Sequence, residues 1–195
     1  MKTTHKILIG SLIVLALIAG INLGVLLNAP QIEIIEASVQ PKSDPTLMLG
    51  QKRPDFKLFD LENRLRSINE WDGKALLINF WATWCEPCRE EIPLFQKIRA
   101  EYQDQFEIIG VALDLPDLVA EMRAELDIEY PLLFGQEDAD QVMRDYGHAT
   151  GTLPYSVFVD SDGIVRHIHD RSLKEDNLRQ ILGKILPNND KMSRN

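Results

Sequence analysis

The longest apolar run of the chain lies near its N-terminus, where residues 7–27 contain no charged side chain. A helix needs about 20 such residues to cross the hydrocarbon core of a bilayer. Lys2 and Lys6 precede the run, whereas the first charge after it is Glu33. Positive charge on the N-terminal side predicts a single-pass anchor in the inner membrane, with residues 1–6 in the cytoplasm and the later residues on the far side.

Two other interpretations compete with an anchor. A cleavable signal peptide has a shorter apolar core, of about 7–15 residues, and needs small residues before its cleavage site. The candidate cleavage positions after Ala29 and Ala37 have bulky Leu27 and Ile35 at their −3 sites. A buried core helix of a small domain is apolar on one face, whereas this run is apolar on all sides. The pattern therefore favours an uncleaved anchor.

The anchor is followed by residues without sustained periodicity. Residues 28–49 contain three prolines and mix polar with apolar positions, which is typical of an extended linker. Residues 188–195 are polar and are predicted to form a disordered tail. Between these segments, residues 50–187 carry the regular patterns of a folded domain.

Within this domain, apolar positions alternate between the periodicities of strands and helices. Apolar runs predict strands at residues 56–61, 64–68, 75–81, 106–113, 130–134, 155–159 and 164–169. Helical spacing predicts helices at residues 86–102, 118–126 and 139–146, and a last helix that Ser172 caps. Strands that alternate with helices predict an α/β sandwich around a central sheet, which begins with an N-terminal hairpin.

Charge and cysteine content narrow the classes of function. The chain contains 21 Lys and Arg against 30 Asp and Glu, which gives −9 at pH 7. With Lys2 and Lys6 on the cytoplasmic side, the exported part carries −11. Such a surface repels phosphate backbones, so no nucleic-acid partner is expected. Because Cys85 and Cys88 are the only cysteines, a disulfide-stapled mini-protein and a four-cysteine zinc module are excluded as well.

The two cysteines lie in the sequence Trp84-Cys85-Glu86-Pro87-Cys88, where a buried strand gives way to a helix. A thiol at a helix N-terminus has free N–H groups and the helix dipole beside it, which lower its pKa and make it nucleophilic. We predict that Cys85 forms a mixed disulfide with a partner and that Cys88 resolves it. Pro87 fits the first helical turn, where its missing N–H is not needed.

A metal site is the alternative use of two such thiols. Zinc needs two further ligands, and His167 with His169 share one face of a predicted strand. Nothing in the sequence brings these histidines to Cys85, so no metal site is predicted. Two thiolates at this spacing can also hold Cu(I), which keeps a copper-binding module as an alternative.

Residues 79–93 resemble the active-site segment of membrane-anchored thioredoxin-like thiol–disulfide oxidoreductases, with the sequence Asn-Phe-Trp-Ala-Thr-Trp-Cys-Glu-Pro-Cys-Arg-Glu-Glu-Ile-Pro. This family contains proteins of the TlpA, ResA and CcmG (DsbE) type, with a redoxin domain of the AhpC/TSA kind. The similarity extends over residues 50–186. It implies a thioredoxin-like three-layer sandwich with a central mixed sheet, an N-terminal hairpin and an inserted helix and strand within residues 115–146.

The resemblance also implies roles for single residues. The proline that matches Pro154 is cis in this family and faces the dithiol. The glutamate that matches Glu91 modulates the thiol pKa and accepts the proton of Cys88, whereas a solvated helix charge is the alternative role for this residue. The implied substrate contacts are Trp84, Glu86, Pro87, Leu153 and Pro154.

Two departures from the family pattern bear on mechanism and substrate. General thioredoxins place a buried Asp where this chain has Asn79. Proteins of cytochrome c maturation usually continue the cis-proline segment with Glu-Thr, whereas Tyr155 and Ser156 follow Pro154 here.

The sequence and the resemblance together imply a membrane-tethered extracytoplasmic thiol–disulfide oxidoreductase. The resemblance favours one that reduces protein disulfides, with cytochrome c maturation as one setting. Its expected partners are protein thiols and disulfides and a membrane thiol-electron carrier, and we expect a monomer without a cofactor. A thiol peroxidase of peroxiredoxin type is one alternative, although Ala82 stands where those enzymes have Thr. A Cu(I)- or apocytochrome-binding module is the other.

Overall fold

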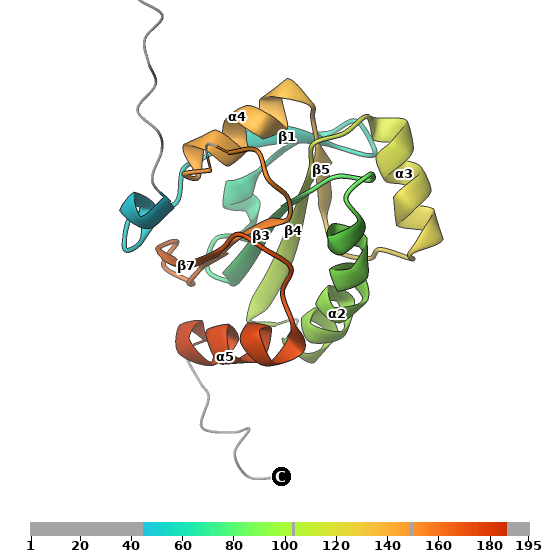
Figure 1. Cartoon of the computed structure of the whole chain (residues 1–195). Helices are drawn as coiled ribbons and strands as arrows, with labels where there is room; N and C mark the ends of the chain where they lie inside the picture. The colour runs from blue at the N-terminus through green and yellow to red at the C-terminus, as the bar shows by residue number, and fades with distance from the viewer. Residues whose placement is uncertain (1–44, 103, 149, 187–195) are drawn as a thin grey trace, which may run out of the picture. The chain divides into compact units, whose positions relative to one another are not determined.

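The computed structural model describes residues 45–102, 104–148 and 150–186 (Figure 1). The predicted cytoplasmic tip, the anchor at 7–27, the tail at 188–195 and nearly all of the linker lie outside the described residues. Within the described ranges, no helix has the length and apolar character needed to span a membrane. All described residues belong to one compact unit.

The described residues contain one mixed sheet of seven strands, in the order β2-β1-β5-β4-β3-β6-β7. These strands are β1 (Lys57–Asp60), β2 (Leu65–Ser67), β3 (Ala75–Trp81), β4 (Phe106–Ala112), β5 (Leu132–Phe134), β6 (Tyr155–Val159) and β7 (Val165–His169). β3 pairs in parallel with β4 and antiparallel with β6, and every residue of β3 and β4 is buried. Their continuous apolar runs therefore reflect strands that are covered on both faces.

Helices cover both faces of this sheet (Figure 1). The α-helices of the described residues are α2 (Glu86–Tyr102), α3 (Pro116–Glu125), α4 (Glu137–Asp145) and α5 (Glu175–Ile185). Apolar side chains of α2, α3 and α5 form one core cluster with one face of the sheet, and those of α4 form a second cluster with the other face. This arrangement confirms the predicted α/β sandwich around a central mixed sheet.

The predicted N-terminal hairpin is also confirmed. β1 and β2 are antiparallel, and Asn63 in the turn between them has a φ of 58°. Asp60 stabilises the turn because its Oδ1 accepts hydrogen bonds from the N–H groups of Glu62 and Arg64. Ser67 then caps a short 3-10 helix, η2 (Ile68–Trp71), through a capping box with its third residue.

Three helices begin at other residues than the pattern predicts, and α4 is one of them, because it begins at Glu137 rather than at residue 139. α3 begins at Pro116 rather than at residue 118, because proline is accommodated at the first helical position. α5 begins at Glu175 with Lys174 as its N-cap residue, so the prediction that Ser172 caps this helix is wrong. The Ser172 hydroxyl instead donates a hydrogen bond to the carboxylate of Glu91.

Candidate active site

Cys85 and Cys88 lie where the central strand β3 passes into α2. The carbonyl of Cys85 accepts hydrogen bonds from the N–H groups of Cys88 at 3.1 Å and Arg89 at 3.2 Å, which makes Cys85 the N-cap residue of α2. The two cysteines form a disulfide, and their Cα atoms are 5.3 Å apart. The buried strand therefore fixes the pair at the positive end of a helix of 17 residues.

The two cysteines differ in their access to solvent. Cys85 is 5% exposed and Cys88 is 1% exposed, so a protein disulfide reaches Cys85 first. Trp84 is 71% exposed beside the pair, and Glu86 and Pro87 are exposed as well. The geometry thus separates an outer sulfur from an inner one.

Glu91 lies one turn after Cys88 on the buried side of α2 and is 2% exposed. Its Oε1 accepts a hydrogen bond from Nδ2 of Asn79 at 3.1 Å, and its Oε2 accepts one from the N–H of Leu173 at 2.8 Å. Asn79 also donates from Nδ2 to Oγ of Ser156 at 3.0 Å. This burial excludes the alternative of a solvated helix charge.

Burial raises the pKa of Glu91 to about 7, against hydrogen bonds from Leu173, Asn79 and Ser172 that lower it. A carboxyl group with a pKa near 7 can both accept and release a proton at neutral pH. Residues three apart on a helix are neighbours on its surface, so Glu91 lies next to Cys88. Cys88 therefore has a buried carboxyl group with a raised pKa one turn away on its own helix.

The Leu153-Pro154 peptide bond is cis, which matches what the family resemblance implies. β6 begins directly after Pro154, and its first residue, Tyr155, pairs with Phe80 of β3. Pro154 therefore lies at the end of the sheet where β3 leads into the cysteine loop. Pro154 is buried, whereas Leu153 is half-buried.

The hydrogen-bond partners of Glu91 and Asn79 are the part of the site that the sequence does not indicate. In the sequence, Asn79 stands out only as the replacement of an Asp, and nothing gives Ser156 or Leu173 a role in the site. Polar residues within apolar strands are the signal for Asn79 and Ser156, because a buried polar group needs a hydrogen-bond partner. Leu173 acts through its backbone N–H, and no side-chain pattern reports such a contact.

The histidines considered as metal ligands lie in another part of the sheet. His167 and His169 belong to β7, at the sheet edge two strands from β3, and their ring centroids are 6.0 Å apart. Within the described ranges, no three or more His, Cys, Asp or Glu side chains gather in a way that could hold a metal ion.

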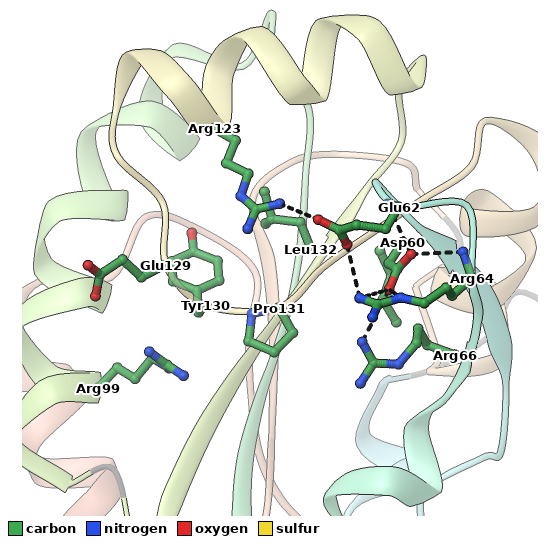
Figure 2. A pocket seen from close by; sticks show the side chains of 11 residues that line it. Asp60, Glu62, Arg64, Arg66, Arg99, Arg123, Glu129, Tyr130, Pro131 and Leu132 are labelled. Atoms are coloured by element: carbon green, nitrogen blue, oxygen red, sulfur yellow. Dashed lines mark hydrogen bonds and ion pairs between the residues drawn. The ribbon is translucent and has the colours of Figure 1, made fainter.

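A charged pocket of about 220 Å³ lies between the N-terminal hairpin, α2 and α3 (Figure 2). No residue of the loop that carries the cysteines lines it. Four arginines line it, and each already pairs with a carboxylate: Arg64 and Arg66 with Asp60, Arg99 with Glu107, and Arg123 with Glu62. The pocket is thus surrounded by a neutralised ion-pair network and is separate from the thiol chemistry.

Residues 49–168 match the AhpC/TSA family. The chain is 35% identical over 141 residues to the thiol-disulfide oxidoreductase ResA of Geobacillus thermodenitrificans. This alignment covers 71% of this chain and 79% of that protein. It is 30% identical over 145 residues to the thioredoxin-like protein YneN of Bacillus subtilis. This alignment covers 72% of this chain and 82% of that protein. A Chlorobium tepidum crystal structure, described as a candidate thiol:disulfide interchange protein DsbE, superposes with a TM-score of 0.64 at 27% identity, over 70% of this chain and 96% of that one.

Proposed function

Since the chain belongs to the AhpC/TSA family, as a thiol–disulfide oxidoreductase of the ResA/DsbE type, we propose that it reduces disulfides of proteins outside the cytoplasm. Its CxxC active site consists of Cys85 and Cys88. The observation that carries the proposal is the buried carboxyl group of Glu91, whose pKa of about 7 suits it to take the proton of the inner thiol.

The first step is attack on the partner. The thiolate of Cys85 attacks one sulfur of the partner's disulfide, so a Cys85–partner bond forms while the partner's S–S bond breaks. The other partner sulfur leaves as a thiolate. Free N–H groups at the start of α2 stabilise the negative charge on Cys85 before the attack.

The second step releases the partner. Glu91 accepts the proton of Cys88, and the resulting thiolate attacks the sulfur of Cys85. The Cys85–Cys88 disulfide forms and the second partner sulfur leaves as a thiolate. Two electrons have then passed to the partner, and the enzyme is in the disulfide form that the structure holds.

We assign contact with the partner chain to the residues that surround the outer sulfur. Trp84, Glu86 and Pro87 are exposed around the start of α2. Leu153 and Pro154 directly precede β6.

The apolar segment at residues 7–27 tethers the domain to the inner membrane in this proposal. Reduction of the Cys85–Cys88 disulfide then needs a thiol-electron carrier of the same membrane. The similarity to ResA supports this extracytoplasmic placement. Cytochrome c maturation is one setting in which protein disulfides need such a reductant.

The test is reduction of insulin by the full-length protein in detergent, with dithiothreitol as the electron source. The wild type should accelerate the precipitation of the insulin B chain, and Cys85→Ser should abolish that acceleration. Cys88→Ser should instead accumulate a mixed disulfide with insulin on a non-reducing gel. Retained activity in Cys85→Ser would sink the proposal, and rapid consumption of hydrogen peroxide would favour a thiol peroxidase instead.

A further inference from the structure

Exposed apolar side chains occur on the two segments that follow the central strands β3 and β4. Seven large apolar side chains are exposed among the described residues, and three of them lie on the segments that directly follow β3 and β4. Trp84 is 71% exposed directly before Cys85, and Leu115 and Leu118 are 48% and 40% exposed at the start of α3. Clusters of exposed apolar side chains mark interaction sites more often than single ones do.

A buried carboxylate joins these side chains into one surface. Asp114 is 6% exposed, and its Oδ2 accepts hydrogen bonds from the N–H and the hydroxyl of Thr83, at 3.1 Å and 2.6 Å. Its Oδ1 accepts one from the N–H of Leu115 at 2.9 Å. The residue before Trp84 and the residue before Leu115 are thus hydrogen-bonded to each other, at the end of the sheet where β3 and β4 end (Figure 1).

The two leucines are not needed to pack α3 onto the core. Val119 and Met122 form its buried face, and they belong to the same core cluster as the two cysteines. Leu115 and Leu118 are three positions apart, so they lie on one side of the helix start. Their exposure therefore leaves apolar area beside Trp84 that the fold itself does not cover.

Negative charge borders this apolar area. Glu86, Asp117 and Glu121 are exposed. Arg89 of α2, which directly follows Cys88, pairs with Glu125 of α3 at 2.6 Å, and this ion pair ties the two helices together. The border can therefore attract a positively charged partner.

We propose that Trp84, Leu115 and Leu118 form the docking surface for the part of a substrate protein that flanks its reactive cysteine. The occupant is a segment with an apolar side chain next to that cysteine, followed by lysine or arginine. The inference rests on the proposed reduction of protein disulfides and specifies its substrate class. An apolar anchor with a charged rim is the usual composition of a protein interface.

The probes are four synthetic peptides with an internal disulfide, which continue after the second cysteine with Leu-Lys, Ser-Lys, Leu-Glu or Ser-Glu. The full-length reduced protein should reduce the Leu-Lys peptide about tenfold faster than the Ser-Glu peptide, because burial and charge both favour it. The double variant Leu115→Ser/Leu118→Ser should lose the preference for Leu. The double variant Asp117→Asn/Glu121→Gln should lose the preference for Lys.

Two controls separate docking from chemistry. Leu65→Ser removes an exposed leucine on β2, at the opposite edge of the sheet from β7 and four strands from β3, and should keep both preferences. Reduction of bis(2-hydroxyethyl) disulfide, which is small and uncharged, should be the same in all variants. If the wild type reduces neither peptides nor this compound, the proposed function fails.

Three results would overturn the docking surface alone. The first is reduction of all four peptides at equal rates by the wild type. The second is an unchanged preference in the α3 variants, or an equal loss in Leu65→Ser. The third is a wild-type dimer that the leucine variant converts to a monomer in sedimentation, because the surface would then join two copies of the chain.

Discussion

Glu91 is balanced between burial, which favours its neutral form, and three hydrogen bonds, which favour its carboxylate. Asn79 matters to this balance because its amide donates to both Glu91 and Ser156 and thereby holds the carboxyl group in place. An Asp at position 79 could not donate in its ionised form. The substitution relative to general thioredoxins therefore moves the buried acid from the strand to the helix.

Replacing Glu91 should slow the release of the partner. In Glu91→Gln the Cys88 thiol has no carboxylate to accept its proton, so resolution of the mixed disulfide should fall by about 100-fold at neutral pH. Acid-quenched time courses on non-reducing gels measure the lifetime of that intermediate. Glu90→Gln removes a neighbouring carboxyl group that is exposed, and it should resolve the intermediate at the wild-type rate. A Glu91→Gln variant that matches the wild type would contradict this role.

The same carboxyl group should make the stability of the oxidised protein depend on pH. The pKa of Glu91 is about 7 in the folded chain and has the ordinary value of 4.5 when unfolded, so between these values the folded chain binds more protons. The free energy of unfolding should therefore fall as pH rises from 4.5 to 7, by on the order of 3 kcal/mol, and stay level above that.

Urea unfolding of the full-length protein and of Glu91→Gln at pH 5 and pH 8 measures this contribution. Burial lowers the pKa of His148 and His167, so these two groups make the free energy of unfolding rise with pH, opposite to Glu91. Both proteins contain these histidines, so the difference in stability between the two proteins is the quantity to compare. Glu91→Gln should gain stability relative to the wild type at pH 8 but not at pH 5. An equal difference at both pH values would contradict the raised pKa.

Among the elements, the connection between the loop after β3 and the start of α3 depends most on one side chain. Asp114→Ala leaves three donors of Thr83 and Leu115 without their acceptor, and it should cost about 2–3 kcal/mol of unfolding free energy. Amide hydrogen exchange at Thr83 should accelerate as well. Asp117→Ala changes an exposed carboxylate of the same helix and serves as the control. Unchanged protection at Thr83 would show that the hydrogen bonds do not hold the loop.

The elements with strong apolar periodicity could be predicted from the sequence with their ends. β3, β6 and α2 have the predicted bounds, because their runs are long or are limited by Pro and charged residues. β5 is shorter than predicted and begins at Leu132, since Tyr130 turns into the core before the strand pairs with β4. The start of α5 could not be predicted from Ser172 either. A serine before a helix can donate its hydroxyl to an acceptor elsewhere in the folded domain, which here is the carboxylate of Glu91.

The site could be predicted only where it is local in sequence. The positions of Cys85 and Cys88 follow from one strand–helix junction, whereas the role of Glu91 is implied only by the family resemblance. The environment of Glu91 could not be predicted, since the contacts Glu91–Leu173 and Asn79–Ser156 join residues 82 and 77 positions apart. Such pairings depend on strand order, and strand order is a property of the whole sheet.

For the whole molecule, the uncharged segment at residues 7–27 predicts behaviour in the cell. The full-length protein should remain with membranes after extraction with alkaline carbonate, because about 20 apolar residues are enough to span a bilayer. Protease added to spheroplasts should digest the domain. Replacing Leu17 and Ile18 with arginine should release the protein into the soluble fraction. A wild-type protein that carbonate extracts would contradict the anchor.

The long-range contacts of Glu91 also set the order in which the protein becomes functional during its synthesis. The chain is made from its N-terminus, so both cysteines emerge well before Ser156 and Leu173. Until the last helix docks, the dithiol is present without the buried environment that sets the proton affinity of Glu91. A nascent chain can therefore form its disulfide early, but the proton transfer proposed for Glu91 becomes available only when folding is complete.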